Sequence, residues 1–449
     1  MTGCDLTLKD AAAALQARLV GRDTVFTGVS SDSRAVQPGE LFVALSGPNF
    51  NAHDFAEDAR QAGAVALLVD HELDCALPQL VAPDTLRALG QLAAYWRSQL
   101  TIPVIAVTGS NGKTTVKEIL KSIFSRLGGT LATKGNLNNH IGVPLTLLSI
   151  NKQHKAAVIE MGANHPNEIS YLTNITRPDV ALINNAAAAH LEGFGSLEGV
   201  AKAKGEIYQG LGKDGTAIIN ADDQFAPLWR QLTRHNKQLT FGLQQPADVC
   251  CQWQGDINGN RLTVRTPKGE FSCVMKLLGR HNVMNALAAT AAAVAADVEL
   301  AVIAEGIAAL NSVPGRLQLK PGINGARIID DTYNANPNSL RAGLEVLAAC
   351  AGKRFLVLGD MGELGENSPE LHKQAGVDAA TLQIDRMFTL GRFSQQAAQA
   401  FGGNARHFDE LDALLKVVVP LLSKDVTVLV KGSRMMRMER VVAALVKQS

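Results

Sequence analysis

Hydrophobic positions in this chain fall into short apolar runs that alternate with stretches of helical periodicity. Residues 104–107 are four consecutive apolar residues, and after a polar turn residues 115–124 carry apolar side chains at i, i+3 and i+4. Such a run is typical of a buried parallel strand, and such spacing is typical of an amphipathic helix. Similar apolar runs return at 156–162 and 180–184. Because strands that alternate with helices form parallel sheets, the pattern predicts a central α/β region.

Before residue 104, strand-like apolar runs and helical stretches alternate less regularly. The pattern there predicts helices at 6–19, 55–62 and 86–100 and strands at 25–31, 39–45 and 64–69. The result is a small unit in which helices and strands are mixed.

Strand-like runs and helical stretches alternate regularly again after a break at Val313-Pro314-Gly315-Arg316. Short alternating runs between 239 and 278 predict an antiparallel addition before that break. Beyond the break, the pattern predicts strands at 326–330, 354–358, 386–390 and 426–430 and helices at 339–349, 369–379, 393–400 and 434–447. This second alternating region has no phosphate-binding loop of its own.

A chain of 449 residues is longer than a single hydrophobic core usually supports. The sequence therefore predicts an α/β fold in three domains. We expect a small mixed α/β N-terminal domain at 1–84, a central P-loop domain with a parallel sheet at 85–313, and a Rossmann-like α/β C-terminal domain at 314–449.

The composition argues against nucleic acid and membranes as binding partners. The formal net charge is +1, which provides no general field to attract nucleic acid or an anionic membrane. No run of 18 apolar residues occurs, so no transmembrane helix is expected. The six cysteines form no C-x-x-C pair and no signal-peptide pattern is present, which predicts free thiols in the cytoplasm.

The turn after the first central strand has the composition of a phosphate-binding loop. It reads T-G-S-N-G-K-T-T over residues 108–115, and Val107 stands where the longer G-x-x-x-x-G-K-[ST] form has its first glycine. A strand, a tight turn and a helix N-terminus direct backbone N–H groups at one point. We therefore predict a nucleotide site made by Val107, Thr108, Gly109, Ser110, Asn111, Gly112, Lys113, Thr114 and Thr115.

Two other central strands end in groups that could hold a metal ion. Glu160 closes one apolar run, and a carboxylate at the end of a strand beside a P-loop suits Mg²⁺ together with the Thr114 hydroxyl. His190 follows the next strand, where a catalytic or metal role and a structural role are both open. Lys202 and Lys204 lie two apart on a helical stretch and so face different directions, which also fits a solvated helix face.

Polar loops follow three strands of the C-terminal region, at 330–337, 359–365 and 431–434. Ligands of open α/β sheets bind outside the carboxyl ends of the strands, so these loops predict a second half-site facing the P-loop. Two classes of function fit. One is an ATP-driven ligase that activates a carboxylate as an acyl phosphate, with a kinase as a close relation, and the other is a nucleotide-operated switch or motor. The N-K-x-D loop of switch GTPases is absent, which favours chemistry on two substrates.

The order of these motifs resembles the Mur ligase superfamily, which also includes folylpolyglutamate synthases. The central strings are T-G-S-N-G-K-T-T, then N-L-N-N-H-I-G-V-P-L-T at 136–146, then E-M-G at 160–162. S-D-S-R at 31–34 and G-E-L-F-V-A-L-S-G at 39–47 look like the UDP-binding N-terminal domain of these ligases. One member of the superfamily is resembled closely by four further strings, N-A-H-D-F, D-D-T-Y-N-A-N-P, L-G-D-M-G-E-L-G and K-G-S-R. The resemblance therefore covers essentially the whole chain.

The resemblance implies a reaction of peptidoglycan synthesis. ATP would phosphorylate the free carboxylate of UDP-N-acetylmuramoyl-tripeptide, and the amine of D-Ala-D-Ala would then attack the acyl phosphate, releasing phosphate and ADP. It implies two Mg²⁺ ions, one on Thr114 and Glu160 and a second near His190, with Lys113 stabilising the transferred phosphoryl group. It also implies carbamylation of Lys204, which matches the A-K-x-x-[IL]-[YF] pattern better than Lys202 does.

Other residues receive roles by the same resemblance. It implies that Asn285 contacts adenine and that Arg316 and Asp331 reach the ribose and phosphates as the C-terminal domain closes. The substrates would be contacted by Ser31, Ser33, Arg34, His53, Asn138, Asn139, Tyr333, Asn334 and Asn336. We expect a cytoplasmic monomer with neither nucleic acid nor a membrane as a partner.

Overall fold

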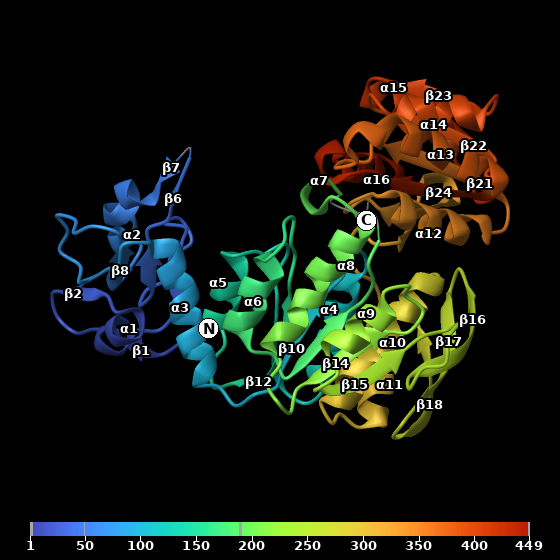
Figure 1. Ribbon diagram of the computed structural model, residues 1–449. Coiled ribbons are helices and arrows are strands. Elements are labelled where there is room, and N and C mark those ends of the chain that lie inside the picture. Colours follow the sequence, from blue (N-terminus) through green and yellow to red (C-terminus); the bar gives the residue numbers. More distant parts are fainter. Residues whose placement is uncertain (1–2, 49, 188–190, 448–449) are drawn as a thin grey trace.

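The computed structural model describes residues 3–48, 50–187 and 191–447 (Figure 1). Each of its three domains is built around one larger sheet, and the C-terminal domain lies over the central domain while the N-terminal domain lies to one side. The predicted fold class is confirmed. The exact boundaries after residues 84 and 313 stay predictions.

The N-terminal domain has a five-stranded sheet in the order β2-β9-β8-β5-β4, parallel except for the β2–β9 pair. Its elements are β1 (Leu6–Thr7), α1 (Leu8–Leu15), β2 (Arg18–Val20), β3 (Val25–Phe26), β4 (Val29–Ser30), β5 (Leu41–Val43), β6 (Ser46–Gly47), β7 (Phe50–Asn51), α2 (Ala56–Gln61), β8 (Ala66–Val69) and β9 (Gln79–Val81).

The central domain has a six-stranded parallel sheet in the order β11-β12-β10-β13-β14-β15 and a separate antiparallel sheet β16-β17-β18. Its strands are β10 (Val104–Thr108), β11 (Gly129–Ala132), β12 (His154–Glu160), β13 (Val180–Ile183), β14 (Thr216–Asn220), β15 (Lys237–Phe241), β16 (Cys250–Asp256), β17 (Gly259–Thr266) and β18 (Gly269–Met275). Its helices are α3 (Thr85–Ser98), α4 (Lys113–Phe124), α5 (Gly142–Leu148), α6 (Glu168–Thr176), α7 (Leu191–Phe194), α8 (Leu197–Gly205), α9 (Ala226–Leu232), α10 (Arg280–Ala295) and α11 (Leu300–Ala309).

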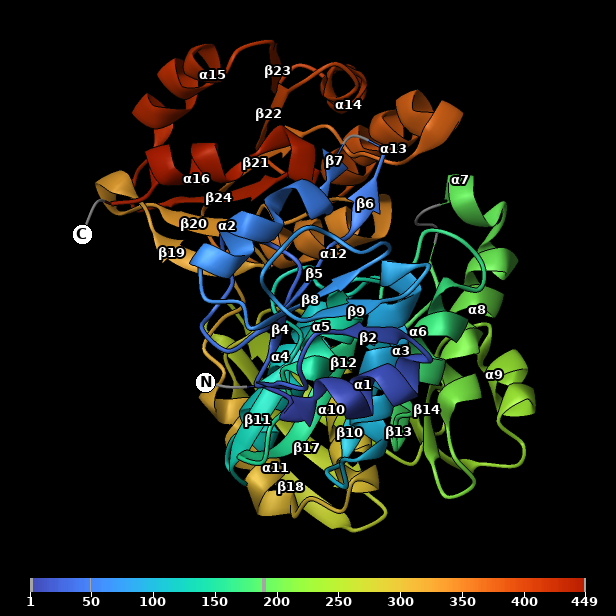
Figure 2. The same cartoon turned by 90° about the vertical axis from the view of Figure 1, so that its left-hand side faces the viewer.

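The C-terminal domain has a sheet in the order β19-β20-β24-β21-β22-β23, parallel except at the edge strand β19 (Figure 2). Its elements are β19 (Gln318–Pro321), β20 (Arg327–Asp331), α12 (Pro337–Ala348), β21 (Lys353–Gly359), α13 (Ser368–Thr381), β22 (Arg386–Leu390), α14 (Ser394–Phe401), β23 (Ala405–Phe408), α15 (Leu411–Val418), β24 (Val426–Lys431) and α16 (Glu439–Leu445).

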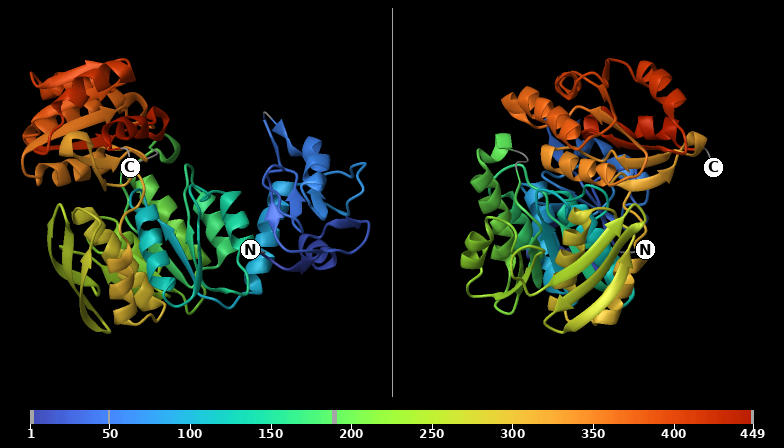
Figure 3. Two further views of the ribbon diagram at one scale, coloured as in Figure 1. Left: turned by 180° about the vertical axis from the view of Figure 1, so that it is seen from behind. Right: turned by 90° about the vertical axis from the view of Figure 1, so that its right-hand side faces the viewer.

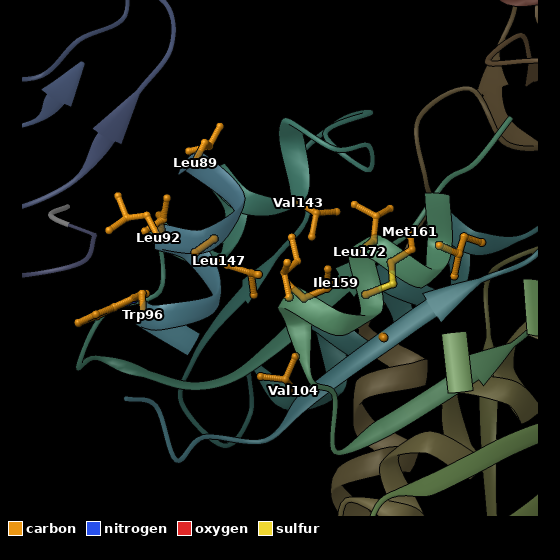
Figure 4. Packing of buried hydrophobic residues seen from close by; sticks show 14 of the residues in the cluster. Leu89, Leu92, Trp96, Val104, Val143, Leu147, Ile159, Met161 and Leu172 are labelled. Carbon is orange, nitrogen blue, oxygen red and sulfur yellow. The ribbon is translucent and has the colours of Figure 1, made fainter. Parts of the chain in front are cut away.

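Helix α3 joins the N-terminal domain to the central one. Asp84 caps it by accepting a hydrogen bond from the backbone N–H of Arg87, and Thr85 Oγ1 donates to the carbonyl of Ala44 at 2.8 Å. Its apolar face, which includes Leu92 and Trp96, packs in one continuous hydrophobic cluster with residues of α5, α6 and the central sheet (Figure 4). This shared core fixes the two domains against each other.

Central helices cover both faces of the sheet, with α4, α10 and α11 in one hydrophobic cluster and α3, α5, α6 and α8 in the other. The antiparallel sheet packs on α10 and α11, on the side away from the N-terminal domain (Figure 3). In the described part of the chain, no helix has both the length and the apolar character needed to cross a bilayer.

Four sequence-based expectations were wrong. The strand expected over 25–31 is two strands, β3 and β4, which belong to different sheets. The helix expected over 6–19 spans only Leu8–Leu15, because Gln16 takes a left-handed conformation and residues 18–20 pair with β9. Residues 239–241 belong to β15 of the parallel sheet and not to the antiparallel addition. The last helix begins at Glu439, after a left-handed residue at Arg437. Pairing with distant strands decides the cases in the sheets, and local periodicity does not encode that pairing.

Candidate active site

The phosphate-binding loop follows β10, the strand that the sequence placed at the centre. Gly112 has φ +80° and forms the N-cap of α4, which begins at Lys113. Asn111 N donates to Asn185 Oδ1 at 2.9 Å, and Lys113 Nζ donates to the carbonyl of Gly109 at 2.6 Å. The loop is thus held from the end of β13 and presents its amides and one ammonium group at the start of a helix, which suits a polyphosphate.

Two residues of the predicted loop have buried side chains. The side chain of Val107 is fully buried in the hydrophobic cluster under α4. Thr108 is also fully buried, and its hydroxyl donates to the carbonyl of Met161 at 2.8 Å. Neither side chain lines the cavity described below, so both side chains serve the packing beneath the loop, and the predicted nucleotide contact of these two residues stays a prediction that concerns their backbone.

Replacement of Gly112 by alanine should strongly weaken nucleotide binding. A Cβ at this position would lie 2.3 Å from Asn285 Oδ1 and 2.4 Å from Asn184 Nδ2, and the positive φ adds strain. Left-handed strain alone costs about 1–3 kcal/mol, so we expect at least a 10- to 100-fold rise in the Kd for ATP, measured by calorimetry. Gly212→Ala is the matched control, because a Cβ there meets no atom within 4 Å. Equal affinities in the two variants would contradict the crowding argument.

Glu160 closes β12 beside the loop. Asn138 Nδ2 donates to Glu160 Oε1 at 2.9 Å, which fixes the carboxylate. Within the described residues, the buried Glu160 Oε2 has no hydrogen-bond partner, although burying an unpaired carboxylate oxygen is costly. Thr114 is the second residue of α4, and both Thr114 and Glu160 line one cavity. An orphaned hard oxygen that shares a cavity with a hydroxyl fits a Mg²⁺ site.

The C-terminal domain contacts the loop directly. Arg316 Nη2 donates to Thr114 Oγ1 at 3.0 Å, and the guanidinium lies 4.3 Å from the centre of the Tyr333 ring. Asn336 Nδ2 donates to Asn111 Oδ1 at 2.7 Å. The predicted second half-site therefore faces the P-loop, as the strand ends required.

Between these two domains lies a cavity of about 500 Å³. Sequence-predicted residues lining it are Ser110, Asn111, Gly112, Lys113, Thr114, Thr115, Asn138, Glu160, Asn285, Arg316, Asp331, Tyr333, Asn334 and Asn336. Lys431, from the K-G-S-R string, also lines it and pairs with Asp331 at 2.5 Å. Lys431 Nζ further donates to the carbonyl of Asn334, so this cation holds two predicted residues in place.

Asn285 belongs to a buried amide network. Asn184 Nδ2 donates to Asn285 Oδ1 at 2.8 Å, and Asn285 Nδ2 donates to Asn282 Oδ1 at 2.9 Å. Asn184 and Asn285 border a smaller space of about 350 Å³. His281 also lines this space, and burial lowers the pKa of His281 to about 4. The sequence analysis missed Asn184 and His281 as site residues, and only the position of Asn184 at the end of a predicted strand could have pointed to it.

Lys204 on α8 is almost fully buried, at 2% exposure. Burial, and then the charge of Lys113, lower its pKa to about 7. Lys202 instead forms an exposed ion pair with Glu198. The two lysines therefore differ as their spacing predicted, and Lys204 is the chemically unusual one. His190 lies outside the described residues, so its predicted role stays a prediction.

A second large cavity of about 720 Å³ adjoins the first one, because Lys113 and Asn138 line both. It lies between the start of α3 and α6, and Asn139 belongs to its wall. Asn139 Oδ1 accepts hydrogen bonds from the backbone N–H groups of Ile141 and Gly142, which leaves its amide nitrogen for other contacts.

The predicted UDP-sugar residues lie at the carboxyl ends of the parallel strands in the N-terminal sheet. Ser31 and Ser33 follow β4 and are half-buried, whereas Arg34 is exposed and pairs with Asp32 at 2.8 Å. This edge is where open α/β sheets bind ligands.

The ring of His53 makes its hydrogen bonds within the same N-terminal domain. Its Nε2 accepts the backbone N–H of Asp70 at 3.1 Å, its Nδ1 lies 2.7 Å from Asn51 Oδ1, and only 3% of its side chain is exposed. The ring stacks on His71, with 5.1 Å between the ring centres. Both ring nitrogens of His53 thus have partners within the domain, and its predicted contact with substrate stays a prediction. Asp70 and His71 are exposed at the same edge of the domain.

Comparison with known proteins agrees with this geometry. Family models match three segments: "Mur ligase family, catalytic domain" at 25–97, "Mur ligase middle domain" at 107–293 and "Mur ligase, glutamate ligase domain" at 315–434. The chain is also 45% identical over 444 residues, 98% of each chain, to UDP-N-acetylmuramoyl-tripeptide–D-alanyl-D-alanine ligase of Escherichia coli strain K12. The chain belongs to the Mur ligase family.

Two solved structures of the Mur ligase family are similar to this chain over nearly its whole length. UDP-N-acetylmuramoylalanyl-D-glutamyl-2,6-diaminopimelate–D-alanyl-D-alanyl ligase from Acinetobacter baumannii is 37% identical with a TM-score of 0.90, covering 99% of this chain and 98% of the other. MurF ligase from Thermotoga maritima in complex with ADP is 28% identical with a TM-score of 0.81, covering 93% and 96%. The family resemblance stated from the motifs is confirmed.

Proposed function

We propose that this chain is an ATP-dependent ligase that joins D-Ala-D-Ala to the free carboxylate of UDP-N-acetylmuramoyl-tripeptide in peptidoglycan synthesis. The observation that carries the proposal is the cavity of about 500 Å³, in which P-loop residues and the C-terminal residues Arg316 and Asn336 face one another. Its junction with the second cavity at Lys113 allows a second reactant to reach the γ-phosphate. The full-length similarity to named ligases favours this reaction over a nucleotide switch.

The reaction has two steps. A carboxylate oxygen of the tripeptide attacks the γ-phosphorus of ATP, and the bond to ADP breaks to give an acyl phosphate. The D-Ala-D-Ala amine then attacks the carbonyl carbon, loses a proton, and expels inorganic phosphate, which keeps the former carboxylate oxygen. The protein contributes positioning and charge neutralisation. Lys113 and Arg316 supply positive charge at the phosphates, and Asn285 contacts the adenine.

Residues of this chain would also hold Mg²⁺. Thr114 and the orphaned Glu160 oxygen fit one ion, and His190 is the predicted contributor to a second. When bound, the ions neutralise phosphate charge. Tyr333, Asn334, Asn336, Asn138 and Asn139 place the reacting peptides, and the N-terminal edge with Ser31, Ser33 and Arg34 receives the UDP-sugar.

Carbamylation of Lys204 belongs to the same proposal. An amine reacts with CO₂ only when it is neutral, and a pKa of about 7 leaves roughly half of this amine neutral at pH 7. The carbamate would place a carboxylate near Lys113, whose charge already contributes to the lowered pKa. We further propose that the chain acts as a monomer in the cytoplasm, where ATP is available.

Phosphate release from ATP tests this function. With UDP-N-acetylmuramoyl-tripeptide and D-Ala-D-Ala together, we expect continuous release and a UDP-muramoyl-pentapeptide identified by mass. Omitting either substrate should remove sustained turnover, because each step consumes one of them. Release from ATP alone, at a rate indifferent to both substrates, would instead support the switch.

A further inference from the structure

The second cavity contains charged groups that the proposed reaction does not yet use. It is lined at the start of α3 by Asp84 and Arg87 and reaches Lys113 at its other end. Arg87 is exposed, and its guanidinium makes no hydrogen bond or ion pair within the described residues. Lys113 is committed to the phosphates, so Arg87 is free to bind a different anion in the same space.

Asp84 offers the opposite charge beside it. One oxygen, Oδ1, accepts the N–H of Arg87 at 2.9 Å and caps the helix. The second oxygen has no hydrogen-bond partner in the described part of the chain, and the Asp84 and Arg87 side chains do not pair with each other. Residues three apart at a helix start lie side by side, so the cavity presents an acceptor and a donor together. That combination is complementary to a group carrying both an amine and a carboxylate.

The wall that holds this pair is rigid. Tyr171 of α6 reaches so close to Gly90 of α3 that a Cβ at Gly90 would lie 1.9 Å from the Tyr171 hydroxyl oxygen. This close approach locks α3 against α6 one turn beyond Arg87. A recognition pair on a helix that is packed tightly against another helix keeps its geometry when the ligand arrives.

We propose that Arg87 and Asp84 recognise the free amino-acid end of a diaminopimelate residue in the acceptor peptide and so determine its specificity. The inference rests on the proposed function and names the third residue of the peptide. Diaminopimelate carries an amine and a carboxylate at the end distant from the reacting carboxylate, whereas lysine carries an amine alone. The D-glutamyl carboxylate has no free amine beside it and so matches Arg87 alone. The related Acinetobacter enzyme is named for a diaminopimelate peptide.

The test compares UDP-muramoyl-tripeptides that end in diaminopimelate or in lysine, with ATP and D-Ala-D-Ala saturating. Wild type should use the diaminopimelate peptide with the lower KM. Arg87→Ala should raise that KM about 10- to 100-fold, the effect of losing a charge-assisted hydrogen bond, and change the KM of the lysine peptide less than about threefold. Asp84→Asn keeps the helix cap and should raise both KM values, because both peptides carry the amine.

Arg230→Ala is the matched control, since Arg230 is an exposed arginine on the distant helix α9. The kcat of Arg87→Ala should stay within about threefold of wild type, because Arg87 touches no reacting atom. An equal rise in KM for both peptides would assign Arg87 to the D-glutamyl carboxylate and overturn the proposal, as would no change for either. Failure of wild type to ligate any peptide would instead overturn the proposed function.

Discussion

Lys113→Met is expected to lower kcat about 1000-fold while the chain stays folded. The ammonium group is the cation that the P-loop places at the junction of both cavities, and among the described residues it donates only to carbonyls of its own loop, Gly109 and Ser110. Removal of one preorganised electrostatic contact costs about 100- to 1000-fold, and here the lost contact is a full charge on the transferred phosphoryl group. Saturating phosphate-release assays and circular dichroism measure the two quantities.

Lys121→Met provides the control for Lys113→Met. It removes a lysine from the same helix, α4, at an exposed position outside both cavities. We expect wild-type turnover from this variant. A Lys113→Met enzyme that keeps more than a tenth of wild-type kcat would show that the transferred phosphoryl group does not depend on this cation.

Lys204→Ala is expected to lower kcat about 100-fold, and removal of CO₂ should also lower the rate of the wild-type enzyme. The side chain is buried with a pKa near 7, so its amine is available to CO₂ at neutral pH. With an ordinary lysine pKa, fewer than about one amine in 1000 would be neutral at pH 7. Raising the pH from 6 to 8 should therefore increase the carbamylated fraction, and added bicarbonate should restore activity lost in CO₂-free buffer.

The Lys202→Ala variant separates this effect from a general loss of charge. Lys202 is exposed on the same helix and paired with Glu198, so its removal should leave the rate and its bicarbonate dependence unchanged. If wild type is insensitive to CO₂ removal and Lys204→Ala turns over at the wild-type rate, the carbamate is not part of the mechanism.

The position of a residue could be predicted directly where the residue stands at the junction of a strand, a turn and a helix that follow one another in the sequence. Lys113, Thr114 and Glu160 sit where β10, α4 and β12 begin or end, and parallel strands bring such ends together. Arg316 and Asn336 received their roles only through the family resemblance, and the structure places both against the P-loop.

Residues whose role depends on distant neighbours could not be predicted. Asn184 and His281 join the site only because β13 and the start of α10 meet beside Gly112. His53 resembled a ligand contact, yet Asn51 and the backbone of Asp70 use both ring nitrogens. Burial and hydrogen-bond partners are properties of the assembled fold, so a motif alone does not show which polar residues face outward.

Transfer of oxygen from substrate to phosphate tests the acyl-phosphate ligation most directly. The tripeptide would be labelled with ¹⁸O in its reacting carboxylate and incubated with ATP, Mg²⁺ and D-Ala-D-Ala. Since that carboxylate attacks the γ-phosphorus and later leaves with it, one ¹⁸O per turnover should appear in the inorganic phosphate, detected by mass spectrometry. Phosphate free of ¹⁸O alongside pentapeptide formation would contradict the account, because the carboxylate would then have been activated without a bond to phosphorus.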